Sequence, residues 1–131
     1  MPFALEYDRN HNILLARFGG TLVREGHQAM VAAVRRFVAS HGLCHAIIDF
    51  GAVEHFRLDL EYIKRIALTP AMLFGRKRVF VAPTDEIFGT MRLFEMLQSA
   101  TGDEPIVVRT MAQAFARLEI ATPDFQPLLP E

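Results

Sequence analysis

The sequence lacks the features that mark several common classes of protein. Its single cysteine, Cys44, excludes an internal disulfide and is typical of a reducing compartment. No apolar run approaches the roughly 20 residues that a membrane-spanning helix needs. Glu6, Asp8 and Arg9 follow the first residues at once, which leaves no room for the core of a signal peptide. We therefore expect a cytoplasmic protein, with peripheral attachment to the inner membrane face as the alternative.

An excess of charge of one sign is also lacking. The formal net charge of −1 gives no reason to expect nucleic acid as a partner. The glycine pair at 19–20 has neither the spacing nor the following lysine of a phosphate-binding loop, so no nucleotide motif is present.

Reactive side chains are scarce. Ser40 and Ser99 are the only serines, and both are expected at helix ends opposite the predicted site, so no nucleophile is indicated. His41, Cys44 and His45 lie close together in the sequence, but neighbouring residues of a strand point to opposite faces, which argues against a metal site. We expect no metal and no cofactor.

What the chain does contain is a regular succession of strands and helices. Its 131 residues are 51% hydrophobic, which suits one domain, 1–131, with an ample core. Apolar alternation predicts strands at 3–7 and 13–18, joined as a hairpin that the glycines at 19–20 end. Residues 120–131 contain prolines and are expected to form an extended tail.

After the hairpin, helices and strands alternate. Apolar stripes and capping residues predict four helices, and short apolar runs predict three more strands. Asp59 caps the second helix, whose inner face we assign to Leu60, Ile63 and Ala67. The predicted ranges are a helix at 24–40, a strand at 45–49, a helix from 58 to before Pro70, a strand at 78–82, a helix from 84 to 102, a strand at 106–109 and a helix capped at Thr110. The order β-β-α-β-α-β-α-β-α predicts an α/β fold with a mixed five-stranded sheet, parallel after the hairpin.

This order, together with several short motifs, resembles a known family. The motifs are Ile47-Ile48-Asp49-Phe50, Val81-Ala82-Pro83-Thr84-Asp85, Phe88-Gly89-Thr90-Met91-Arg92-Leu93-Phe94, Val107-Val108-Arg109-Thr110 and Gln113-Ala114-Phe115. From about residue 3 to 118 the chain is similar to STAS domains, the fold of anti-sigma-factor antagonists, and most of all to the small stand-alone SpoIIAA-like proteins. The resemblance implies a regulatory or ligand-binding module without established chemistry.

One departure from that family concerns its regulation. Antagonist members are switched by phosphorylation of a serine at the start of the second helix, whereas the matching residues 56–60 contain no hydroxyl group. Asp59 is then either a permanent imitation of the phosphate charge or an ordinary helix cap. The group has also been compared with lipid-binding CRAL-TRIO-type domains, which adds an apolar ligand to the expected partners.

Charged side chains are predicted to gather where the parallel strands end, the edge at which open α/β sheets bind ligands. These binding candidates are Asp49, Glu54, His55, Arg57, Asp59, Asp85 and Arg109. An enzymatic alternative pairs His55 with Asp49, or with Glu54, as acid and base. The plainer alternative is a solvated loop, with an Asp–Arg pair that ties the strand ends together.

The segment 71–78 is a second candidate surface. It carries three large apolar side chains followed by three cations, namely Met72, Leu73, Phe74, Arg76, Lys77 and Arg78. Such a loop is able to insert into an anionic membrane surface. It is equally suited to cover the end of the sheet as core, or to form a homodimer contact.

The third helix carries Leu93 and Met96 beside its main stripe, so its Met and Phe side chains are candidates for lining an apolar pocket. The sequence as a whole predicts a non-enzymatic module that binds a partner protein or a small apolar ligand. Membrane or lipid association through 72–78 is the first alternative, and the His55–Asp49 enzyme is the second.

Overall fold

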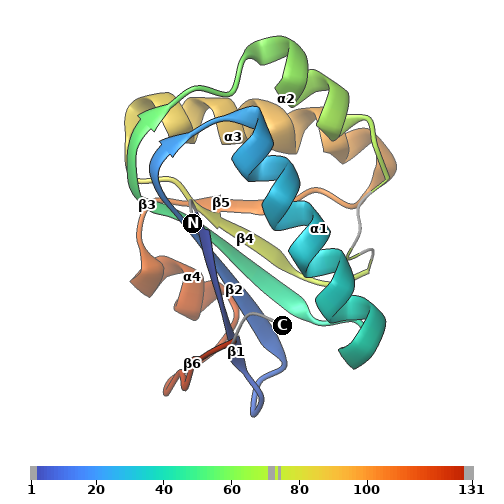
Figure 1. Cartoon of the computed structure of the whole chain (residues 1–131), viewed down its shortest axis with the longest axis vertical. Coiled ribbons are helices and arrows are strands. Elements are labelled where there is room, and N and C mark those ends of the chain that lie inside the picture. Colours follow the sequence, from blue (N-terminus) through green and yellow to red (C-terminus); the bar gives the residue numbers. More distant parts are fainter. Residues whose placement is uncertain (1–2, 71–72, 74, 129–131) are drawn as a thin grey trace.

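A mixed sheet lies at the centre of the protein. The computed structural model describes residues 3–70, 73 and 75–128, and its strands run in the order β5-β4-β3-β2-β1-β6 (Figure 1). β2 to β5 pair in parallel, whereas β1 is antiparallel to both β2 and β6. The strands are β1 (Phe3–Asp8), β2 (Ile13–Leu22), β3 (His45–Phe56), β4 (Arg78–Val81), β5 (Ile106–Val108) and β6 (Gln126–Pro127). The predicted α/β class and mixed sheet are confirmed, but the strands number six rather than five.

Helices cover both faces of this sheet. They are α1 (Arg24–His41), α2 (Leu60–Ala67), α3 (Asp85–Gln98) and α4 (Met111–Arg117), with a short 3₁₀ turn, η1 (Ser99–Thr101), after α3. Figure 1 shows α1, α2 and α3 together on one side of the sheet and α4 on the other. Within the part of the chain that is described, no helix is long and apolar enough to cross a membrane.

Two apolar clusters follow from this layering. Successive residues of a strand point to opposite faces, so Leu14, Ala16 and Phe18 of β2 pack under α1 to α3. Ile13 and Leu15 of the same strand pack with α4 instead. Burial on both faces explains why the central strands read as continuous apolar runs in the sequence.

Side-chain N-caps lie at the predicted starts of the helices. The Asp59 carboxylate accepts from the Tyr62 N–H at 2.8 Å, and the Thr84 hydroxyl accepts from the Ile87 N–H at 3.2 Å. Thr110 and Gln113 form the predicted capping box of α4. The inner face of α2 differs from the prediction, because Leu60 is 50% exposed and Tyr62 is buried in its place beside Ile63 and Ala67.

β2 and β3 continue well past their predicted ends. β2 runs through Gly19 and Gly20 to Leu22, and β3 runs on to Phe56, so the glycines do not end the pairing. Two register shifts let β3 place extra residues opposite β2. Beyond Phe18 no β1 pairing is present among the described residues, and β4 pairs with β3 only as far as Asp49, so β2 and β3 extend as a two-stranded ribbon.

The C-terminal segment supplies the additional strand. β6 pairs with β1 through Tyr7 and Gln126, and the Leu128 N–H donates to the Leu5 carbonyl at 2.9 Å. Just before it, the Asp124 N–H donates to the buried Asp8 carboxylate at 3.0 Å. The segment is extended, as predicted, but it belongs to the sheet.

Candidate ligand site

A small apolar cavity lies between the sheet and the helices α1, α2 and α3 that cover one of its faces. Its volume is about 60 Å³. It is lined by Phe18, His27, Met30, Ile48, Phe50, Leu58, Ile63, Ile66, Phe80, Met91 and Phe94. His27 is the one polar residue of this lining. A cavity with so few polar groups does not hold water in a fixed position, so an apolar group suits it.

His27 forms a hydrogen-bonded pair with a neighbouring helix. Its Nδ1 lies 2.6 Å from the Tyr62 hydroxyl oxygen, so α1 and α2 are joined at the edge of the cavity. The imidazole stacks on Phe18 and meets the Tyr62 ring edge-on. Burial lowers the pKa of His27 to about 4, so the ring is neutral at pH 7. Burial likewise raises the pKa of the Tyr62 hydroxyl, against the opposing effect of nearby Arg24 and Arg65.

A charged pair lies next to this hydrogen bond. The Arg24 guanidinium lies 5.0 Å from the centre of the Tyr62 ring and 3.3 Å from Oδ2 of Asp59. Both partners are well exposed, at 41% and 63% of their side-chain surface, so the ion pair is worth little by itself. The polar groups of the site thus gather where α1 and α2 begin.

His27 has a signal in the sequence, namely its position on the buried stripe of α1. His27 precedes Met30 by three positions and Val34 by seven, which places it on the buried stripe of α1. A histidine on such a stripe needs a hydrogen-bond partner in the core. That partner, Tyr62, lies 35 residues away in sequence, and the sequence alone does not bring the two together.

Asp49, the first predicted binding residue, serves its own strand. The side chain is 8% exposed, and its Oδ1 accepts from the Gly51 N–H at 2.8 Å. This bond holds the backbone where β3 leaves the main sheet and the first register shift occurs.

His55 and Arg57 are exposed at the far end of the β2–β3 ribbon. Asp49 and His55 are six positions apart on β3, and a strand rises about 3.3 Å per residue, which separates them by up to about 20 Å. The structure therefore does not bring the two side chains together as an acid–base pair. Glu54 is exposed on the same ribbon.

Asp85 and Arg109 do meet at the carboxyl edge of the sheet. Arg109 donates to the Asp85 carboxylate at 2.9 Å, and its guanidinium lies 4.0 Å from the centre of the Phe88 ring. This is an Asp–Arg pair of the kind that the sequence offered as the plainer alternative. The Asp85 side chain is 97% exposed, so the pair is a surface contact. The predicted residues consequently do not form one common site.

The predicted membrane loop divides into parts with different roles. Leu73 is 3% exposed and belongs to the core, and Met72 and Phe74 lie outside the described residues. Arg76 and Lys77 are exposed, as a surface role requires.

Arg78 differs from its two cationic neighbours and from the prediction. Its side chain is 11% exposed and donates to the Gln98 side chain at 3.0 Å and to the Asp103 carbonyl. Arg78 thus joins β4 to the end of α3 through one guanidinium nitrogen, while its buried Nε has no partner among the described residues.

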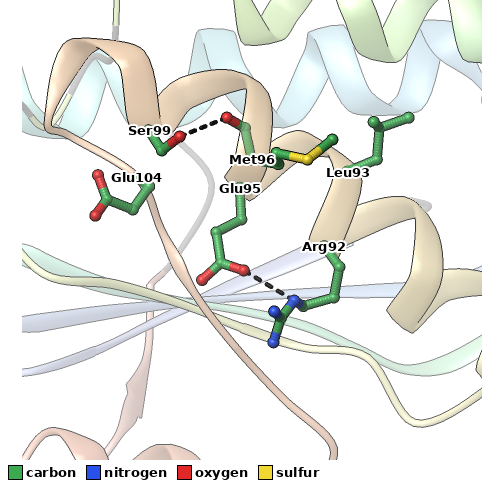
Figure 2. A pocket seen from close by; sticks show the side chains of 6 residues that line it. All are labelled: Arg92, Leu93, Glu95, Met96, Ser99 and Glu104. Carbon is green, nitrogen blue, oxygen red and sulfur yellow. Dashed lines mark hydrogen bonds and ion pairs between the residues drawn. The ribbon is translucent and has the colours of Figure 1, made fainter.

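Leu93 and Met96 face away from the cavity. They line an open depression on the outer side of α3, together with Arg92, Glu95, Ser99 and Glu104 (Figure 2). Polar groups there are engaged with one another: Arg92 pairs with Glu95 at 3.0 Å, and the Ser99 hydroxyl donates to the Met96 carbonyl at 2.6 Å. Met91 and Phe94, on the opposite side of α3, line the cavity in their place.

The Cys44–His45 region has no geometry for metal binding. Across residues 3–70, 73 and 75–128, no three His, Cys, Asp or Glu side chains converge on one point. Cys44 is 1% exposed and burial raises the pKa of its thiol, which makes it inert. His45 accepts from the Lys77 N–H at 3.0 Å. Its pKa is lowered by burial and by the neighbouring cations Arg76 and Lys77.

Comparison of the sequence with known proteins found no matching family model and no matching curated protein. The features of the protein that bear on function are the cavity, its polar edge and the sequence motifs.

Proposed function

We propose that this protein is a non-enzymatic STAS-like binding module whose ligand places an apolar group in the cavity between the sheet and α1, α2 and α3. The observation that carries the proposal is the cavity itself, in which ten of eleven lining residues are apolar. The lining residues come from three strands, three helices and the turn before α2. The sequence motifs support the STAS-like part of the proposal.

The volume limits what the ligand is. An enclosed apolar cavity of about 150 Å³ holds benzene or xenon, and pockets for drug-sized ligands span about 300–1,000 Å³. At about 60 Å³, this cavity accepts an apolar group smaller than benzene. A longer lipid tail requires α1, α2 or α3 to move outward.

Regulation by phosphorylation has no support at its usual place. Residues 56–60, where α2 begins, contain no hydroxyl group, and Asp59 uses Oδ1 to cap α2 at the Tyr62 N–H and Oδ2 to contact Arg24. Both interactions are those of a structural N-cap.

Xenon under pressure tests the cavity directly. Met30 and Met91 line it, whereas Met96 is 63% exposed on the outer side of α3. In ¹³C-methyl-methionine NMR, we expect the Met30 and Met91 signals to shift in a saturable way with xenon pressure and the Met96 signal to stay in place. An equal, linear drift of all three signals would show that the cavity takes up nothing and would remove the proposal.

A variant provides the matched control. Ile66→Phe places a larger side chain at the partly buried end of the lining and should abolish the saturable shifts. Leu68→Phe changes a residue that is 77% exposed nearby and should leave them unchanged.

A further inference from the structure

The polar edge of the cavity indicates the chemical class of the ligand. We infer that the ligand is a short aliphatic monocarboxylic acid, with its tail in the cavity and its carboxylate at His27, Tyr62 and Arg24. This inference rests on the proposed function and adds to it the nature of the head group.

The polar groups of the site lie at one end of an otherwise apolar lining. His27 is the sole polar residue of the lining, and its partner Tyr62 joins it from α2. Tyr62 and Arg24 lie outside the lining, and Arg24 in turn contacts the Tyr62 ring and Asp59. A wholly apolar ligand would make no use of this arrangement, whereas a molecule with one polar end matches it.

The His27–Tyr62 pair keeps one hydrogen-bond donor that its mutual hydrogen bond does not use. A neutral imidazole has one N–H donor and one nitrogen acceptor. If the Tyr62 hydroxyl donates to Nδ1, the His27 Nε2–H remains as a donor. If Nδ1–H donates to Tyr62, the Tyr62 hydroxyl proton remains. Among the described residues, no partner of Nε2 is present, so in either tautomer one donor is available for a ligand oxygen.

The positive charge of Arg24 favours a negatively charged head group on the ligand. Arg24 is the cation closest to the pair, and its exposed contact with Asp59 at 3.3 Å is easily exchanged. Asp59 keeps its capping bond to Tyr62 through the other oxygen, so the exchange does not disturb α2. A ligand carboxylate fits this position because charge-assisted hydrogen bonds to Arg are the strong ones.

Tail length follows from the volume. A cavity of about 60 Å³ is smaller than one that holds benzene, so the tail must be short. Each buried methylene should lower the dissociation constant about fourfold. The gain should stop when the tail fills the space.

The experiment measures the dissociation constants of straight-chain carboxylates from acetate to octanoate, with the Met30 and Met91 methyl signals as the readout. Straight-chain alcohols of equal length serve as the matched series. We expect the carboxylates to bind at least about tenfold more tightly than the alcohols, with an optimum at intermediate length.

Variants assign the head group. Arg24→Gln should weaken carboxylate binding about tenfold and leave alcohol binding unchanged, and Tyr62→Phe should weaken both series several-fold. Arg35→Gln, an exposed change on the same helix, is the control. Equal affinity for acids and alcohols, or no effect of Arg24→Gln in the folded protein, would overturn the inference while xenon uptake keeps the proposed function. Failure of xenon as well would remove both.

Discussion

The side chain of Asp49 folds back onto its own strand. It accepts the Gly51 N–H at 2.8 Å, just where β3 begins to pair with β2 alone. A carboxylate at the end of a parallel strand indicates a ligand site in many α/β proteins. Here the register shift in β3 leaves a backbone donor that the carboxylate satisfies, and this local requirement explains the residue.

The closeness of Asp49 and Gly51 leads to a prediction for stability. A Cβ atom at Gly51 would lie 2.9 Å from Oδ1 of Asp49, so Gly51→Ala should lower the free energy of unfolding by about 1–3 kcal/mol. In urea denaturation, the double variant with Asp49→Ala should lose less than the sum of the two single changes, because the clash is then absent.

Gly89 is the matched control for this substitution. It is exposed within α3 and a Cβ there meets nothing within 4 Å, so Gly89→Ala should raise the free energy of unfolding by about 0.5–1 kcal/mol. If the Gly51 and Asp49 changes prove additive, the two side chains do not compete for the same space.

At the scale of elements, the helices were predictable and the strand ends were not. The predicted 24–40 helix agrees with α1 (Arg24–His41), and the caps at Asp59, Thr84 and Thr110 are confirmed. These signals lie within a few residues of the ends they define. The continuation of β2 past Gly20 depends instead on β3, more than 30 residues away, and no local pattern encodes that pairing.

β6, too, was not predictable from a local sequence pattern. Its attachment to β1 should depend on pH. Burial raises the pKa of Asp8. Hydrogen bonds from the Asp124 N–H and from the His11 ring and N–H outweigh this effect and hold the pKa below its ordinary 3.8. A carboxyl with a lowered pKa stabilises the fold above its unfolded-state pKa, and the stabilisation is lost as the pH falls through the folded-state pKa.

Asp8→Asn should therefore lower the free energy of unfolding by about 2 kcal/mol at pH 7. The difference from the unaltered protein should shrink as the pH falls below 3.8. Urea denaturation between pH 7 and pH 2.5 measures both effects. Hydrogen exchange of the Leu128 N–H, which donates to Leu5, reports whether β6 detaches. Glu61→Gln, an exposed acid change on α2, should stay within about 0.5 kcal/mol of the unaltered protein at pH 7. A constant deficit for Asp8→Asn at every pH would contradict the assignment.

At the scale of the whole molecule, the fold class was predictable because alternation of apolar stripes and runs encodes layers. The candidate site was not, because it depends on the distance between two helices. Met91 and Phe94 of α3 are buried and line the cavity. His27 gains its importance only when α2 places Tyr62 against it.

At the surface of the molecule, some cations of the segment 71–78 are exposed and one is buried in structural contacts. Arg76 and Lys77 are exposed, whereas Arg78 is 11% exposed and bound to Gln98 and Asp103. Each basic residue near an anionic membrane contributes about 1 kcal/mol, so the exposed pair supplies about 2 kcal/mol. We expect weak, salt-sensitive co-sedimentation with phosphatidylserine vesicles, abolished by the double change Arg76→Gln and Lys77→Gln.

Arg78→Gln separates the structural cation from the surface cations. It should lower the free energy of unfolding by about 1–3 kcal/mol, because Gln98 and the Asp103 carbonyl lose a charged donor. The double change at Arg76 and Lys77 should stay within about 0.5 kcal/mol of the unaltered protein, as exposed substitutions do. Vesicle binding well beyond what two cations supply would instead require an apolar anchor, and the membrane alternative would then replace the cavity as the main site of action.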